Sequence, residues 1–270
     1  MHQKNQLPAF ATRRIGRVNW IGLWTLYSRE VQRFFKVVLQ TVLAPSITTL
    51  LFLAIFMLAL GGADRTVAGV AYADFLVPGL VMMAIVQNSF ANTSSSLLIS
   101  KVQGNIVDVL MPPLSAGELT IAYALGGLTR GLLVAFVVTV PLSFVIDVNV
   151  DHPLTALYFA ASASLMLSLL GILGGIWSDK FDHLAALTNF VIMPLSFLSG
   201  TFYSIQRLPP LWQEATSLNP FFYAIDGFRY AFIDRSDAPI LQGATVLFVL
   251  NIVLWFSCHW VFKKGYRLKA

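Results

Sequence analysis

Residues 103–118, QGNIVDVLMPPLSAGE, form a short polar interruption between two of the most apolar parts of the chain. Three apolar residues in it recur at helical spacing: Ile106, Val109 and Leu110. Asn105 and Asp108 take other positions, so the pattern predicts about two turns of amphipathic helix. We expect this helix to lie parallel to a membrane surface, with its apolar face toward either the membrane or a protein partner. A plain loop is the alternative.

The sequence also predicts that both ends of this short helix are fixed. Pro112 and Pro113 end it, because a proline inside a helix removes a backbone donor and clashes with the preceding turn. Ser115 and Glu118 then have the spacing of a capping box, which begins the following helix. A rigid element of this kind suits the docking of a soluble partner better than a slack loop does.

The composition of the whole chain indicates that the flanking apolar segments cross a membrane. Of its 270 residues, 57% are hydrophobic and 11% are charged, whereas soluble domains have about 25% charged residues. A span needs about 20 mostly apolar residues to cross roughly 30 Å of hydrocarbon, so this length has room for about six spans. A large soluble domain would not fit as well. The sequence therefore predicts an all-α integral membrane protein.

Six apolar runs have the length of a span. They are approximately residues 37–60, 75–99, 119–146, 154–177, 184–203 and 240–262. They belong to one predicted membrane domain, residues 19–265, with terminal tails at 1–18 and 263–270. Small residues cluster in LGGLTRG (125–131) and LLGILGG (169–175). Such clusters let membrane helices approach closely, within one subunit or between two.

The basic residues are divided unevenly between the two sides of this topology. Thirteen fall on the side of the two termini: Lys4, Arg13, Arg14, Arg17, Arg29, Arg33, Lys36, Lys101, Lys180, Lys263, Lys264, Arg267 and Lys269. Four fall on the other side: Arg65, Arg207, Arg229 and Arg235. Because cytoplasmic loops are enriched in Lys and Arg, both termini are predicted to be cytoplasmic. This asymmetry accounts for the net charge of +5, so a nucleic-acid partner is not needed.

Residues 19–36, before the first predicted span, have aromatic and basic sides at helical spacing. Such a helix is expected to lie in the membrane interface, in contact with lipid. Glu30 does not suit a site beside anionic head groups, so we interpret it as a contact with a protein partner. A plain surface anchor is the alternative.

Residues 204–239 are too polar to cross a membrane and too apolar for a simple loop. Two short helices are predicted there, one beginning at Pro209 and Pro210 and one at Asn219 and Pro220.

The second of these helices, from Phe221 to about Ile233, is roughly 20 Å long and too short for a full crossing. A re-entrant or interfacial hairpin on the outer side is therefore expected. Asp226 and Arg229 are three residues apart on this helix, so we expect them to pair.

The order of these elements resembles the permease subunit of ABC-2 type exporters, and within that family the YadH-like branch, which is related to permeases of nodulation-factor and drug export. The resemblance covers about residues 18–265. It rests on QGNIVDVLMPPLSAGEL (103–119) after the second span and FLSGTFYSIQRLPPLWQEATSLNPFFYAIDGFR (197–229) after the fifth. The second motif has the family's spacing at Ser199-Gly200, Leu208-Pro209, Asn219-Pro220, Tyr223 and Arg229.

The resemblance implies a half-transporter in the bacterial inner membrane, whose two copies form the pathway and dock two copies of a separate ATPase. The helix after the second span would be the coupling helix, and the N-terminal helix would lie against the same ATPase. The implied coupling residues are Gln103, Asn105, Ile106, Val107, Asp108, Leu110, Met111, Arg29 and Glu30. The implied outer gate consists of Gly200, Pro209, Asn219, Pro220, Tyr223, Asp226 and Arg229. No cofactor is expected on this chain, since ATP and Mg²⁺ would bind to the ATPase.

Two other classes of protein are considered. The sequence contains no G-x-x-x-x-G-K-[ST] phosphate loop, so an exporter would need a separate ATPase. A secondary transporter usually has ionisable residues at membrane depth, and Arg130 in the third span is the one deep charge expected here. A membrane-embedded enzyme could use Asp179, Asp182 and His183 as metal ligands, although this turn is more simply a cap of the fifth span.

Overall fold

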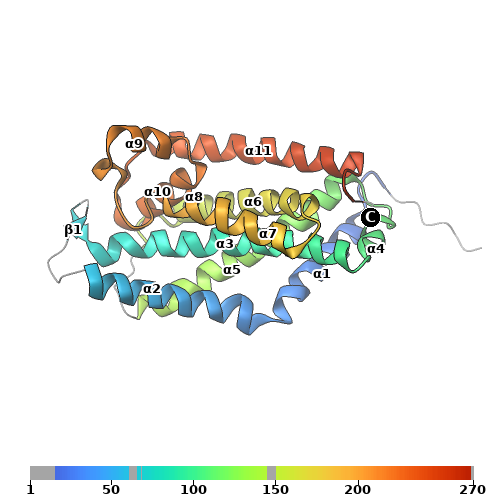
Figure 1. The fold of residues 1–270 in the computed structure, drawn as a ribbon, viewed down its shortest axis with the longest axis horizontal. Coiled ribbons are helices and arrows are strands. Elements are labelled where there is room, and N and C mark those ends of the chain that lie inside the picture. The colour runs from blue at the N-terminus through green and yellow to red at the C-terminus, as the bar shows by residue number, and fades with distance from the viewer. Residues whose placement is uncertain (1–15, 61–65, 68, 145–149, 269–270) are drawn as a thin grey trace, which may run out of the picture.

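The computed structural model of the chain describes residues 16–60, 66–67, 69–144 and 150–268. The predicted N-terminal tail up to residue 15, Arg65, the end of the predicted third span (145–146) and residues 269–270 lie outside the described part. Within that part the chain is a bundle of long helices, which run roughly along the long axis of the molecule (Figure 1).

Five described helical stretches are long and apolar enough to cross a membrane. They are η1 with α2 (Leu39–Leu43 and Ala44–Leu60), α3 (Tyr72–Val102), α5 (Ala116–Ser143), α6 (Pro153–Trp177) and α11 (Ile240–Lys264). Each coincides to within a few residues with one of five predicted spans. The prediction of a mostly helical membrane protein is confirmed.

The predicted fifth span, 184–203, differs from the structure. A continuous apolar helix runs over Phe181–Phe197 instead, and it consists of α7 (Phe181–Leu187), the π-helical turn η2 (Thr188–Ile192) and α8 (Met193–Phe197). It is about 26 Å long, slightly short of the roughly 30 Å of a bilayer core. It ends early because the Ser199 and Thr201 hydroxyls both donate to a carbonyl of its last turn, and Gly200 takes a left-handed φ of 77°.

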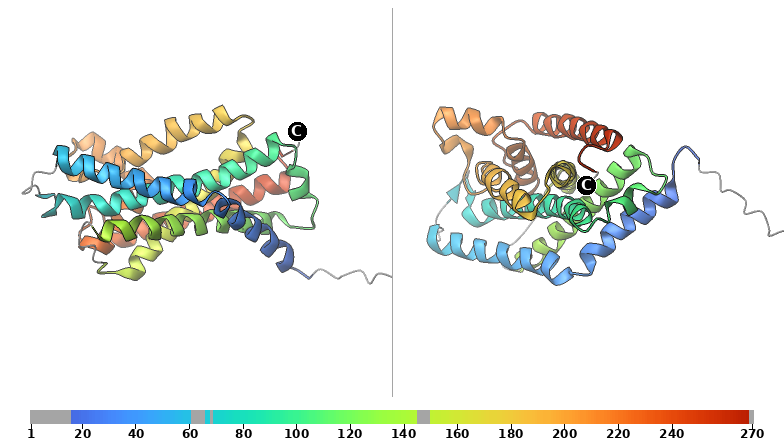
Figure 2. Two further views of the ribbon diagram at one scale, coloured as in Figure 1. Left: turned by 90° about the horizontal axis from the view of Figure 1, so that it is seen from below. Right: turned by 45° about the vertical axis from the view of Figure 1, so that its right-hand side comes forward.

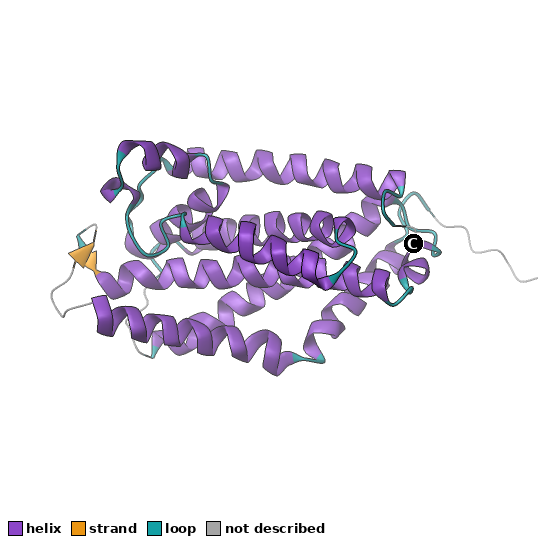
Figure 3. Cartoon of the chain, viewed as in Figure 1, coloured by secondary structure: helices purple, strands orange, loops and turns teal. Residues whose placement is uncertain are grey.

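The remaining elements lie at the two ends of the bundle (Figures 1 and 2). α1 (Trp20–Phe35) begins at one end, near α4 (Ile106–Leu110) and the end of α11. The opposite end has the strands β1 (Thr66–Val67) and β2 (Val70–Ala71), the 3-10 turn η3 (Ile205–Arg207), α9 (Pro210–Ser217) and α10 (Pro220–Ile233). The two strands pair antiparallel and are the only strands in the described ranges (Figure 3). We call these ends the α4 end and the α9 end.

α3 is the central helix and is buried along most of its length. It packs against α2, α5, α6 and α10. Its hydroxyl groups find partners on α6: Ser89 and Ser164 share a 2.7 Å hydrogen bond, and Thr93 donates to the Ser168 carbonyl at 2.8 Å. The hydroxyl groups of Ser89 and Thr93 are thus accommodated in the core because each has a partner on α6.

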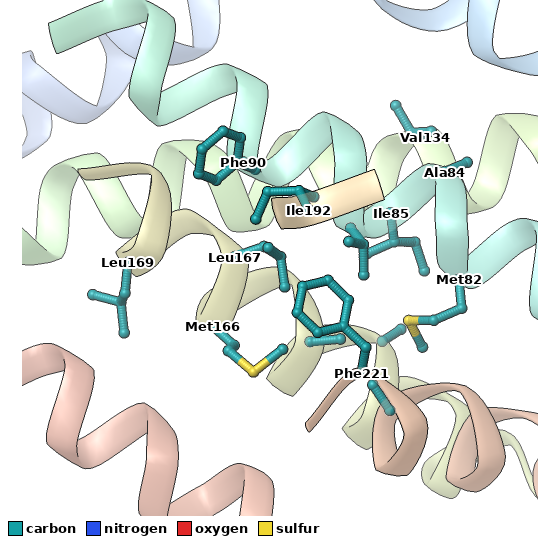
Figure 4. Packing of buried hydrophobic residues seen from close by; sticks show 14 of the residues in the cluster. Met82, Ala84, Ile85, Phe90, Val134, Met166, Leu167, Leu169, Ile192 and Phe221 are labelled. Atoms are coloured by element: carbon teal, nitrogen blue, oxygen red, sulfur yellow. The ribbon is translucent and has the colours of Figure 1, made fainter. Parts of the chain in front are cut away.

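Apolar side chains fill the space around these hydrogen bonds. Figure 4 shows Met82 and Ile85 of α3, Leu167 of α6, Ile192 of η2 and Phe221 of α10 meeting in one cluster. α10 therefore begins inside the bundle, well away from the α9 end at which it finishes.

Small residues let α6 approach its neighbours closely. A Cβ placed on Gly175 of α6 would lie 2.7 Å from the Ser94 carbonyl oxygen of α3, which is too close for any real contact. Gly131 of α5 faces serine hydroxyls of both α3 and α6 at similarly short range. The two small-residue segments, 125–131 and 169–175, thus pack within the chain.

Candidate functional site

α4 follows α3 after a sharp turn at the α4 end. Gly104 has a left-handed φ of 74°, which a glycine adopts without strain, and the chain reverses there. Ile106 and Val109 are only 4% and 3% exposed and belong to the main core, and Leu110 packs against it. The apolar face of the predicted helix is therefore turned into this chain. Both expectations for it, the membrane and a partner, are wrong.

The accessible side of α4 combines apolar and acidic residues. Val107 and Met111 are 52% and 76% exposed, and Asp108 between them is exposed as well. Gln103 and Asn105 are exposed on the turn before the helix. We call these five residues the α4 face. They are the exposed members of the implied coupling helix, whereas Leu110 is partly buried.

The capping box after α4 is present as predicted. The Glu118 amide donates to Ser115 Oγ at 3.3 Å, and the Ser115 amide donates to Glu118 Oε2 at 2.6 Å. The other oxygen of Glu118 accepts the backbone amide of Asn19, whose side chain caps α1 by accepting from the Gly22 amide at 3.0 Å. One carboxylate thus joins the starts of α1 and α5 next to α4. The sequence predicted the capping box but not the part played by Asn19.

Glu30 of α1 is fully buried, which corrects the expectation that it contacts a partner directly. Its carboxylate accepts from Arg33 Nε at 3.2 Å, Arg29 Nη2 at 3.3 Å and Ser96 Oγ of α3 at 2.9 Å. Arg29 is half-exposed and also donates to the Tyr123 hydroxyl of α5. The inward face of α1 is therefore fixed to α3 and α5 by charged hydrogen bonds, which a surface-lying helix would not need.

Cations from two other elements bind the end of α6. Lys101 Nζ, near the end of α3, donates to the Ile176 and Ser178 carbonyls at 2.7 and 2.8 Å and to Asp179 Oδ1 at 3.1 Å. Arg267, after α11, donates to the Trp177 carbonyl at 2.8 Å. These cations satisfy the free carbonyls and oppose the negative end of the helix dipole. The hydrogen bond and charge of Lys101 hold the pKa of the Asp179 carboxyl below its usual value.

The turn of residues 179–183 is thus part of this helix end. In the described ranges, no group of three or more His, Cys, Asp or Glu residues is placed to hold a metal ion. The deep cation Arg130 donates to Asn88 Oδ1 of α3 at 2.9 Å, within the bundle.

The two short helices at the α9 end begin where the sequence predicts. Pro210 is the first residue of α9. Asn219 caps α10 by accepting the Phe221 amide at 3.0 Å, and its amide group donates to the Leu195 carbonyl of α8 at 2.8 Å. Tyr223 is nearly buried, and its hydroxyl accepts from Gln242 of α11. α10 is buried on almost every side, against α3, α6 and α11.

Asp226 and Arg229 do not form the expected ion pair in the described structure. The Asp226 oxygens accept the backbone amides of Asp237 and Ala238 at 2.8 and 3.0 Å. Arg229, which is 2% exposed, donates instead to the Gly200 carbonyl at 2.7 Å and to the Phe75 carbonyl at 3.3 Å. Its guanidinium also lies 3.8 Å from the centre of the Phe75 ring. The pairing fails because backbone groups of three segments are nearer partners for both side chains.

The sequence pattern of the ABC-2 type transporter family matches residues 22–233. The chain belongs to this family. Over 251 residues it is 34% identical to the protein named "Inner membrane transport permease YadH" of Escherichia coli K12, covering 93% of this chain and 98% of that protein. It is 24% identical over 246 residues to "Nodulation protein J" of Neorhizobium galegae, covering 87% of this chain and 90% of that protein.

In this ABC-2 type chain the implied site residues fall at opposite ends of the bundle. The α4 face lies at one end, with Arg29 and Glu30 on the adjoining helix. Around the α9 end, Arg229 donates to the Gly200 carbonyl and Asp226 accepts backbone amides of the turn before α11, whereas Pro209 is exposed.

Four residues joined to these groups were not predicted as site residues: Asn19, Arg33, Lys101 and Asp237. Each bonds to groups that lie far from it in the sequence; Arg33, besides Glu30, donates to the Asn92 carbonyl at 2.7 Å.

Proposed function

We propose that this chain is the membrane permease subunit of an ATP-driven exporter and acts as a dimer. A separate ATPase subunit would dock on the α4 face of each copy and supply ATP and Mg²⁺. The relative named as an inner membrane transport permease supports a location in the bacterial inner membrane. Membership of the ABC-2 type transporter family supports an ATPase partner.

The α4 face is the observation that supports this proposal most strongly. Its Val107 and Met111 are exposed although Ile106 and Val109, one or two positions away from them, are buried. α4 is thus held firmly by its inner face and offers its outer face to another molecule. The prolines Pro112 and Pro113 and the capping box connect α4 rigidly to α5. A push on the α4 face would therefore move α5 and α1 together with α4.

In this proposal both termini and α4 lie in the cytoplasm, and the α9 end lies outside. The basic residues Lys101, Lys263, Lys264 and Arg267 gather at the α4 end, as the positive-inside rule requires of a cytoplasmic side. Phe181–Phe197 would be the sixth crossing. Its 26 Å, about 4 Å less than a typical core, can be accommodated by slight thinning of the bilayer.

We further propose that α9 and α10 form a re-entrant hairpin that closes the pathway on the outer side. The start of α10 packs among mid-bundle residues, while Arg229 near its end contacts Phe75 near the start of α3. A 14-residue helix of about 21 Å that begins in the core and ends at the α9 end does not cross the membrane.

The second copy would pack against the face of α2. Apolar side chains form an exposed stripe along that helix and the preceding turn: Leu39, Leu43, Ile47, Leu51, Ile55 and Leu58. Their spacing of four residues, or three at the end, places them on one side of the helix. That side is open to lipid or to a partner helix, and the dimer proposed here uses it for the partner.

Arginine substitutions on the α4 face test the coupling proposal. We expect Asp108→Arg and Met111→Arg to lower the amount of co-purified ATPase at least about tenfold, a loss of about 1.4 kcal/mol in binding. The physical reason is that an arginine replaces a complementary acidic or apolar contact at the centre of the interface. Pull-down of the ATPase encoded with this chain, from detergent extracts at equal permease loading, measures the effect.

The matched control is Glu214→Arg on α9, which makes the same charge change on an exposed residue at the other end. It should leave co-purification and membrane insertion unchanged. Undiminished recovery of the ATPase with both α4 variants would overturn the coupling proposal.

A further inference from the structure

A cavity at the α9 end gathers three arginines from separate segments. Its volume is about 260 Å³, and it is lined by Phe75 at the start of α3, the η3 turn, the end of α10 and the turn before α11. The arginines are Arg207, Arg229 and Arg235. We call this cavity the outer arginine pocket. Every arginine and lysine among the described residues of the α9 end lines it.

The carboxylates of the pocket do not neutralise these cations directly. Asp226 accepts two backbone amides, as described above. Asp237 accepts the Ser204 hydroxyl at 2.9 Å and the Ile205 amide at 3.0 Å. Asp226 thus holds α10 to the turn before α11, and Asp237 holds that turn to the start of η3. No ion pair links either of them to an arginine among the described residues.

The guanidinium groups, by contrast, have donors to spare. Arg207 and Arg235 are exposed, and their side chains have neither a hydrogen bond nor an ion pair within the described structure. Arg229 is buried and uses Nε and Nη2 for carbonyl oxygens, so its Nη1 has no described protein acceptor.

From this arrangement we propose that the outer arginine pocket binds an oxyanion group of the phosphate type. Guanidinium forks bind phosphate oxygens in pairs of parallel hydrogen bonds, and three of them around one cavity leave a net positive charge beside the two carboxylates. The oxyanion is either the head group of a lipid-like molecule at the membrane surface or a free phosphate group. The inference that this oxyanion belongs to the exported cargo rests on the proposed function. The binding of an oxyanion in the pocket does not depend on that function.

Protection of the arginines from phenylglyoxal, which modifies accessible guanidinium groups, tests this inference. The full chain is placed in nanodiscs of phosphatidylcholine, and peptide mass spectrometry measures the modification rates of Arg207 and Arg235. The exposed Arg17, near the start of α1, is the internal control. At inorganic phosphate about four times its Kd, and at constant ionic strength, both pocket rates should fall about fivefold while that of Arg17 stays constant.

A second arm uses nanodiscs that contain phosphatidylglycerol without added phosphate. Protection in this arm alone identifies a lipid head group as the ligand. Protection in the first arm identifies a free phosphate. Either result supports oxyanion binding in the outer arginine pocket. Arg235→Gln should remove the protection of Arg207, whereas Arg17→Gln should not. Rates at Arg207 and Arg235 that follow Arg17 in both arms would overturn the inference. Since no ATPase takes part, this outcome is separable from a failure of the coupling proposal.

Discussion

At the scale of single residues, buried carboxylates fix the positions of neighbouring elements in this chain. Glu30 joins α1 to α3, Glu118 joins α1 to α5, and Asp226 joins α10 to the turn before α11. In each case the acid accepts from several donors, which is the condition under which burial of a charge is tolerable. Their partners lie far apart in the sequence, so spacing alone could not reveal them.

Removal of the Glu30 carboxylate should destabilise the chain. Glu30→Ala leaves Arg33 Nε and the Ser96 hydroxyl without their acceptor. We expect the free energy of unfolding to fall by about 2 kcal/mol, less than for a fully buried pair because Arg33 is partly exposed and keeps Asn92 as an acceptor. Glu30→Gln keeps one acceptor and should cost about half as much. Titration of the detergent-solubilised protein with dodecyl sulfate measures both.

Glu214→Ala, on the exposed surface of α9, provides the reference for this measurement. It removes a carboxylate that makes no ion pair in the described structure. An unfolding midpoint of Glu30→Ala that equals that of Glu214→Ala would show that the network around Glu30 adds nothing to stability.

At the scale of elements, the close approach of α6 to α3 determines the core. Glycine at 171 and 175 brings the α6 backbone against carbonyl oxygens of α3, and hydroxyl groups bridge the two helices nearby. Membrane helices gain little from the hydrophobic effect among themselves, so such packing and hydrogen bonding supply much of their association.

The adjacent glycines of α6 allow a paired test of this packing. Gly175→Ala places a methyl group against the Ser94 carbonyl, a backbone atom that cannot rotate away, so stability should fall by about 1–3 kcal/mol. Gly174→Ala meets only the ends of the Phe90 and Leu187 side chains at 3.3 and 3.4 Å. It should be neutral or raise stability by up to about 1 kcal/mol through helix propensity. Thermal unfolding in detergent measures both, and equal midpoints would contradict the packing argument.

At the scale of the whole molecule, the two ends of the bundle are built differently. The α4 end has a short helix held by its inner face, and cations that satisfy the carbonyls of α6. The α9 end has the buried helix α10 and the outer arginine pocket. This division agrees with the proposal that an ATPase docks at the α4 end and that the α9 end closes the pathway.

The orientation of the bundle can be tested by cysteine labelling. The single cysteine, Cys258, is buried and can be replaced by serine to give a cysteine-free background. In that background we expect Gln206→Cys at the α9 end to react with a membrane-impermeant maleimide in intact spheroplasts. Met111→Cys at the α4 end should react only after permeabilisation, because the reagent does not cross the membrane. Labelling of Met111→Cys in intact spheroplasts would contradict the proposed topology.

Much of this architecture is predictable from local patterns. Long apolar runs located five of the long helices, the spacing of Ser115 and Glu118 predicted the capping box, and Asn219 with Pro220 predicted the start of α10. These predictions succeed because hydropathy, helix caps and proline act through near neighbours in the chain. The motif of residues 197–229 and the family match both indicate the ABC-2 type, because both read patterns of residues along the chain.

The fate of individual polar side chains is where local patterns fail. Glu30 has the sequence context of a surface residue but is buried, and Asp226 and Arg229 have the spacing of an ion pair but bond to separate backbone groups. The apolar face of α4 likewise packs against core residues from other parts of the chain, which the sequence of α4 alone does not reveal.

The sequence by itself determined that this chain is a helical membrane protein of the ABC-2 type, where its long helices lie to within a few residues, and which short segment interrupts them. Only the tertiary structure decided which sides of α1 and α4 are accessible, and that three arginines surround one cavity. The physical reason is that a helix boundary depends on neighbours within about four residues. The environment of a charge depends instead on donors and acceptors brought together from the whole chain.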